Sequence, residues 1–116
     1  MKTILVASDF SPAAYNAVNY AADMAISINA KLLLLTVVQT PVGYSELPIV
    51  VSLEDMLRST ERDMKHLKEE LMLKTGNKLS IETEVGMGAF YSELKDVCER
   101  VKPYAVVMGS QGKTAA

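Results

Sequence analysis

The sequence has little of what several classes of protein require. Its single cysteine, Cys98, excludes a disulfide framework and a cysteine-based zinc site, and is typical of a reducing compartment. Lys and Arg number 12 against 14 Asp and Glu, so the net charge is −2 and no nucleic-acid partner is expected. No apolar run reaches the length of about 18 residues that crosses a bilayer, so we expect no membrane-spanning segment.

The remaining composition is that of an ordinary globular domain. Of 116 residues, 49% are hydrophobic and 22% are charged, which is typical of one small domain that buries a core without disulfides. Met1 is followed by a strand-like run, not by the charged segment and cleavage site of a signal peptide. We therefore expect a cytoplasmic protein with no membrane partner.

Strand-like and helical patterns alternate along the chain. Apolar runs predict strands at 2–8, 30–38, 79–85 and 104–108, and helical spacing predicts helices at 12–28, 52–74 and 90–101. Ser11-Pro12 is typical of a helix start, Ser52 with Asp55 of a capping box, and Pro103 of a helix end. This alternation indicates an α/β protein with a mostly parallel sheet.

The segments between these elements also carry predictions. Residues 39–50 contain two prolines and a glycine and predict a long loop, whereas Gly86-Met87-Gly88 predicts a turn. The run 79–85 alternates apolar and polar residues, which favours a strand near the sheet edge. Open parallel sheets bind their ligands at the carboxyl ends of their strands, so we look for function at the strand ends.

The loop that follows the last strand is the sharpest of these features. Gly109 and Gly112 bracket two polar residues, which lets backbone N–H groups converge on an anion, and Lys113 and Thr114 add a cation and a hydroxyl. A plain strand-to-helix turn has the same spacing. A Walker A loop is excluded, because it requires glycine five residues before Gly112, where the chain has Val107.

Asp9, at the end of the first strand, has three interpretations. It is a carboxylate that stabilises the start of the first helix, an acceptor for a ribose hydroxyl or a base, or a phospho-acceptor or metal ligand. The third interpretation needs further acids at the strand ends, and the third strand ends in Val85-Gly86. We therefore expect no metal site.

No catalytic constellation can be assembled from the sequence. His66 is the only histidine, lies off the apolar stripe of the second helix, and is far in sequence from every strand end. Cys98 borders the apolar face of the third helix and is expected to be a small buried hydrophobe. No general base is evident, and an enzyme is not the expected class.

Four segments of the sequence form a specific set. They are ILVASDFSPAAYNAVNYAADMA, LLLLTVV, Val85-Gly86 and VVMGSQGKT. With them the chain resembles the universal stress proteins, of the adenine nucleotide alpha-hydrolase-like superfamily, over essentially its whole length. The resemblance implies a three-layer, doubly wound, Rossmann-like fold on a parallel sheet. Family members have five strands in the order 3-2-1-4-5, and this chain would supply 3-2-1-4.

The resemblance also implies an ATP or AMP site, with or without magnesium. The positions that match it are Ala7, Asp9, Val37, Gly86, Met108, Gly109, Gly112, Lys113 and Thr114. Ala7 and Asp9 would line the adenosine, the backbone of Val37 would meet the adenine, and Gly86 would lie near the ribose. The two glycines of the closing loop would cradle phosphates.

One part of the family pattern is missing. The third glycine falls nine residues after Gly112, beyond Ala116, as do the family's last helix and strand. The chain over 1–116 is then a fragment, one half of a tandem protein, or impaired in nucleotide binding.

We expect a stress-response protein whose nucleotide site acts as a sensor, in a homodimer or tandem pseudo-dimer. The alternatives are a protein that works through dimer or partner surfaces without nucleotide, and a slow ATPase.

Overall fold

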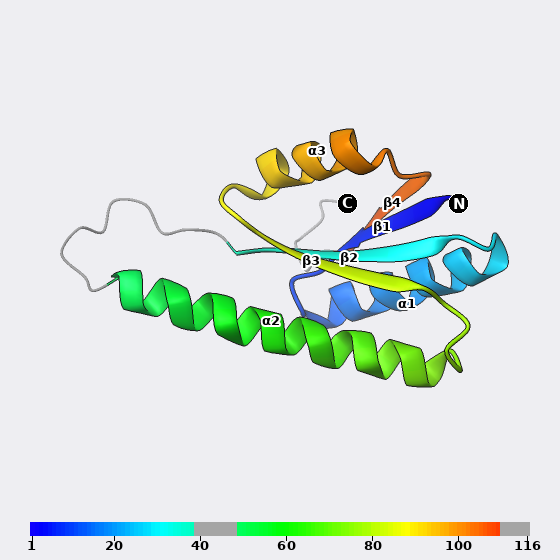
Figure 1. The fold of residues 1–116 in the computed structure, drawn as a ribbon, viewed down its shortest axis with the longest axis horizontal. Helices are drawn as coiled ribbons and strands as arrows, with labels where there is room; N and C mark the ends of the chain where they lie inside the picture. The colour runs from blue at the N-terminus through cyan, green and yellow to red at the C-terminus, as the bar shows by residue number, and fades with distance from the viewer. Residues whose placement is uncertain (39–48, 110–116) are drawn as a thin grey trace.

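The protein folds as alternating strands and helices in a computed structural model that describes residues 1–38 and 49–109 (Figure 1). The elements are β1 (Thr3–Ala7), α1 (Pro12–Ser27), β2 (Lys31–Val38), α2 (Ile49–Lys74), β3 (Ile81–Met87), α3 (Phe90–Val101) and β4 (Ala105–Met108). All seven expected elements are present, in the expected order. No helix in the described part is long and apolar enough to span a membrane.

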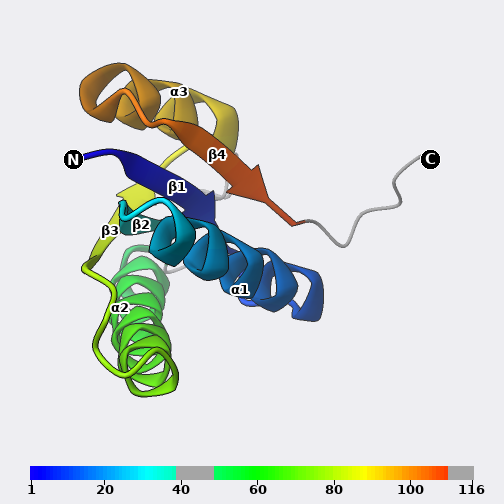
Figure 2. The same ribbon diagram turned by 90° about the vertical axis from the view of Figure 1, so that its right-hand side faces the viewer.

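The four strands form one all-parallel sheet in the order β3-β2-β1-β4. The helices α1 and α2 lie on one face of this sheet and α3 lies on the other (Figures 1 and 2). This confirms the three-layer α/β fold and the strand order implied by the family resemblance. It also confirms β3 as an edge strand, and β4 forms the other edge among the described residues.

Two predicted boundaries are wrong. Gly86 and Met87 are not in a turn, because β3 continues through them and pairs with Val37 and Val38 of β2. The turn is confined to Gly88, which has a φ of 125°. The second helix begins at Ile49, earlier than the predicted start at Ser52. The β-branched residues before Ser52 have low helix propensity, and local propensity favours a later start than the fold adopts.

The start of α1 follows from local chemistry. The Ser11 side chain accepts a hydrogen bond of 3.1 Å from the Ala14 backbone N–H, and Pro12 occupies the first turn, where its missing N–H costs nothing. The buried face of α1 consists mostly of alanine. Such small side chains let the helix lie close to the sheet.

The buried side chains divide between the two faces of the sheet. On the α1/α2 face, strand residues such as Leu32 and Leu34 pack with alanines of α1 and with Met64 and Leu67 of α2. On the α3 face the cluster is smaller and consists of Leu5, Leu33, Leu35 and Val97.

The β4 part of the α3 face is open. Val106 and Met108 pair with Leu5 and Ala7 of β1, so their side chains point to the α3 side of the sheet. Their exposed fractions are 42% and 49%, whereas Leu5 is fully buried. The short helix α3 thus covers the central strands and leaves the β4 edge exposed.

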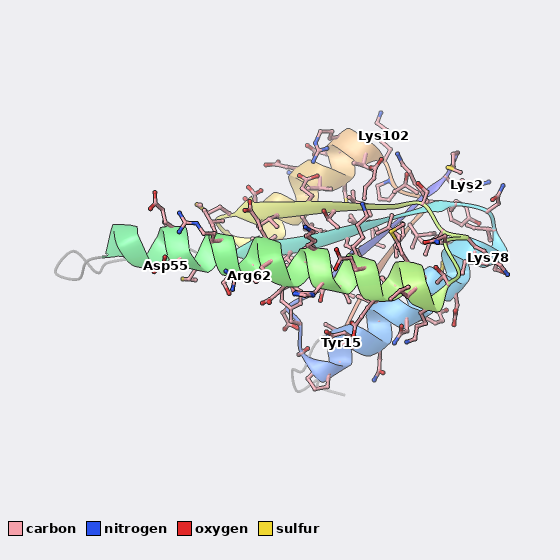
Figure 3. The ribbon with its side chains drawn as sticks, turned by 60° about the horizontal axis from the view of Figure 1, so that its bottom comes forward. Lys2, Tyr15, Asp55, Arg62, Lys78 and Lys102 are labelled. Carbon is pink, nitrogen blue, oxygen red and sulfur yellow. The ribbon has the colours of Figure 1, made fainter. Side chains whose placement is uncertain are left out.

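The helices end at the amino edge of the sheet with residues in the left-handed conformation. Asn29 follows α1 with a φ of 59°, Asn77 follows α2 with a φ of 60°, and Lys102 follows α3 with a φ of 53°. Lys2, Lys78 and Lys102 gather at this end of the molecule, opposite Asp55 (Figure 3). Cations are favourable there because helix carboxyl ends carry partial negative charge.

Candidate functional site

A hollow lies on the α3 face of the sheet, at the carboxyl ends of β1, β2 and β4. Its volume is about 370 Å³, within the range of about 300–1,000 Å³ that is usual for small-molecule sites. It is lined by Ala7, Ser8, Asp9, Val37, Phe90, Tyr91, Met108 and Gly109. The strand order places β1 between β2 and β4, so segments far apart in sequence meet here.

The structure therefore brings together five of the nine predicted site residues. Ala7, Asp9, Val37, Met108 and Gly109 all line this hollow. The sixth, Gly86, pairs with Val37 on the neighbouring strand but is not among the lining residues.

The remaining three predicted residues, Gly112, Lys113 and Thr114, lie outside the described residues. Their assignment to phosphate binding stays a prediction.

Asp9 is held in a tight turn between β1 and α1. Its Oδ1 accepts a hydrogen bond of 2.9 Å from the backbone N–H of Ser11, and the Ser8 hydroxyl accepts one of 3.1 Å from the N–H of Phe10. Hydrogen bonding by Ser11, from its side chain and its backbone, lowers the pKa of the Asp9 carboxyl below its ordinary value. The side chain is exposed and ionised at neutral pH, so it offers a hydrogen-bond acceptor to the hollow.

This turn carries backbone strain. Phe10 has a φ of 64°, a left-handed conformation that is unfavourable for a bulky residue. The turn is anchored by Ser8, whose N–H donates to the Leu35 carbonyl at 2.8 Å and whose carbonyl accepts from the Thr36 hydroxyl at 2.8 Å. Phe10 also packs against the α1/α2 core. The strained turn fixes Asp9 at the rim of the hollow.

Gly109 is required by packing. A Cβ at this position would overlap the carbonyl oxygen of Ala13 and lie 2.9 Å from the Cβ of Ala17. The end of β4 thus passes so close to the first turns of α1 that no side chain fits. This explains the glycine without a ligand, and the predicted contact of Gly109 with phosphate stays a prediction.

Gly86 has a similar structural role on the other side of the site. A Cβ here would lie 2.7 Å from the Oε1 atom of Glu93 in α3. The absence of a side chain lets Glu93 fold onto β3 and seats the first turn of α3 against the sheet. The expected position of Gly86 near a ribose is not tested by this contact.

Three lining residues were not among the predicted site residues: Ser8, which follows β1, and Phe90 and Tyr91, which begin α3. Phe90 was identified only as an apolar helix position. The sequence signal that could have identified the two aromatic residues is their position directly after the glycine-rich end of a strand, which places both rings at the carboxyl edge of the sheet.

Other hollows have different surroundings. One of about 460 Å³ lies against α2, shares Asp9 and Val37 with the site, and includes Asp55 and Met56. Another, of about 560 Å³, lies at the amino edge beside Lys2 and Tyr104. The Lys2 Nζ atom there is 5.1 Å from the centre of the Tyr104 ring. The amino-edge hollow contains none of the predicted site residues.

The described residues show no second chemistry at the site. Within 1–38 and 49–109, no three His, Cys, Asp or Glu side chains are placed to hold a metal ion. His66 is exposed on α2, as expected, whereas Cys98 on α3 is only partly buried and packs against the edge of the α3-face cluster.

The fold is that of a doubly wound α/β protein, with a hollow at the carboxyl edge of its sheet, where strand order reverses. The model of the universal stress protein family matches residues 1–116. The chain belongs to the universal stress protein family. No curated protein sequence matches it closely enough to count as a relative.

Solved structures agree with this assignment. The universal stress protein UspA from Lactobacillus plantarum superposes with a TM-score of 0.81 at 23% identity, covering 98% of this chain and 80% of that one. A universal stress protein in complex with cAMP gives 0.69 at 21% identity, covering 91% and 74%. A family protein from Arabidopsis thaliana with AMP bound gives 0.62 at 22% identity, covering 97% and 78%.

Proposed function

We propose that the carboxyl-edge hollow binds an adenine nucleotide and that the protein is a stress-response sensor of that nucleotide. The observation that carries the proposal is the meeting of Ala7, Asp9, Val37 and Met108 in one hollow, although they come from three separate strands or strand ends. Similar proteins bind cAMP and AMP, which supports an adenine nucleotide over other small molecules.

The chemistry of the lining fits such a ligand. The ionised Asp9 carboxylate accepts hydrogen bonds, as the hydroxyls of a ribose require. Ala7, Val37 and Met108 provide apolar surface for a base. The helix α1 begins at this edge with no acidic residue in its first turn, and its partly positive amino end favours a phosphate.

Calorimetric titration of the full chain with AMP tests the proposal. We expect saturable binding, and we expect Asp9→Asn to weaken it by about ten-fold, because a hydrogen bond to a charged group contributes about 1.5–3 kcal/mol. Asp96→Asn is the matched control, since Asp96 is an exposed carboxylate of α3 that does not line the hollow. Absence of saturable binding of AMP, ATP and cAMP by the wild-type chain would contradict the proposal.

Finer features extend the proposal. We propose ATP as an alternative ligand, bound with or without magnesium, and a homodimer in the cytoplasm as the acting form. Titration with ATP in the presence and absence of magnesium tests the choice of ligand. Sedimentation of the chain with and without nucleotide tests the homodimer, and a single monomeric species in both would contradict it.

A further inference from the structure

Two aromatic side chains of α3 face the hollow, and the nucleotide proposal leaves them unused. Phe90 and Tyr91 both line it, next to Val37 and Met108. Tyr91 is 75% exposed, which means that its ring lies at the rim instead of within the core. An exposed tyrosine ring offers a large, flat apolar surface to a ligand that binds in the hollow.

The ring of Tyr91 packs against the neighbouring ring of Phe90. Its centre lies 5.1 Å from that of Phe90, with the two planes at 77°, an edge-to-face arrangement. Phe90 is itself half-buried. The first turn of α3 is seated by Glu93, whose carboxylate lies against Gly86 and Gly88 of the β3 end.

We propose that Tyr91 stacks on the heteroaromatic base of the ligand and supplies affinity that does not depend on which base it is. This inference rests on the proposed nucleotide function and assigns the contact with the base to one residue. Tyr91 lines the hollow together with the apolar side chains of Val37 and Met108, and Asp9 adds a polar group to the same lining. Aromatic stacking tolerates every base, because each base has a π-face.

The stacking role predicts a pattern across ligands that a general structural role does not. Tyr91→Leu removes the ring and keeps an apolar side chain, so it weakens AMP and GMP by the same factor of about ten. It leaves binding of ribose 5-phosphate, which has no base, unchanged. Tyr91→Phe retains the ring face and restores AMP affinity to within about two-fold of wild type.

The experiment is a set of calorimetric titrations of the full chain with AMP, GMP and ribose 5-phosphate. Tyr20→Leu is the matched control, because Tyr20 is an exposed tyrosine of α1 that does not line the hollow. Thermal unfolding of each variant verifies that it folds.

The outcomes separate the two proposals. If wild type binds AMP and Tyr91→Leu binds it equally well, the stacking inference is overturned and the nucleotide site stands. Equal weakening of ribose 5-phosphate and AMP by Tyr91→Leu also overturns it, since the residue would then act through the shape of the site. If wild type binds none of AMP, ATP and cAMP, the nucleotide function fails and the stacking inference fails with it.

Discussion

The two faces of the sheet differ in how they are covered. On one face, the alanines of α1 and the Met64–Leu71 stripe of α2 bury the strands in a continuous core. On the other, the short helix α3 buries three strand leucines around its own Val97 and leaves Val106 and Met108 open. The hollow with Asp9 lies on this thinly covered side. The larger core lies on one face, and the proposed ligand site lies on the other.

The test of this comparison with the largest expected effect uses two neighbouring leucines of β2. Leu34 and Leu35 are both fully buried but point to opposite faces. Truncation of a buried leucine to alanine costs about 2–5 kcal/mol, and more where the surroundings cannot collapse. We expect Leu34→Ala, on the α1/α2 face, to lose more free energy of unfolding than Leu35→Ala. Urea unfolding followed by circular dichroism measures both, and equal losses would show that the two faces are packed alike.

An intermediate effect is expected at the two glycines that border the site. Gly109→Ala places a methyl group against the backbone of Ala13 in α1, so we expect a loss of about 1–3 kcal/mol from overpacking. Gly86→Ala meets only the carboxylate of the flexible Glu93 side chain, which can move. The same urea experiment should give a loss below about 1 kcal/mol for Gly86→Ala. The reverse order would place the tighter contact on the α3 face.

The smallest effect concerns the turn at the rim of the hollow. Because the pKa of Asp9 is lowered from its ordinary value of 3.8, its ionised form stabilises the fold. That contribution is present above pH 3.8 and is lost as the pH falls through the lowered pKa. We expect the difference in Tm between wild type and Asp9→Asn to shrink as the pH falls from 6 toward 3. A difference that grows with acid would contradict the hydrogen-bonded turn.

Most of the fold could be predicted from the sequence, because each element has a local cause. The apolar run of β2, the Ser11-Pro12 helix start and the small-residue face of α1 all act over a few residues. The continuation of β3 through Gly86 could not, since it depends on pairing with β2, which local pattern does not encode. The start of α2 was misplaced for a different reason, because the β-branched residues before Ser52 have low helix propensity and local pattern favours a later start.

Part of the lining of the candidate site could be predicted from the sequence. Asp9 and Gly109 lie at strand ends and are each next to a serine, and such a polar strand end can be recognised without a structure. The place of Tyr91 depends on how α3 lies against the sheet, which is a tertiary arrangement that local pattern does not encode. The structural reason for Gly109, its fit against α1, likewise required coordinates.

The left-handed residues that end the helices have a consequence for how this protein can change. Lys102 lies in a conformation that costs a residue with a Cβ about 1–2 kcal/mol and glycine much less. It is at the amino edge of the sheet, whereas the hollow is at the carboxyl edge. Replacing Lys102 by glycine should therefore raise the thermal stability of the fold without changing the proposed site. Because the two positions lie at opposite ends of the sheet, stability and ligand binding can evolve independently.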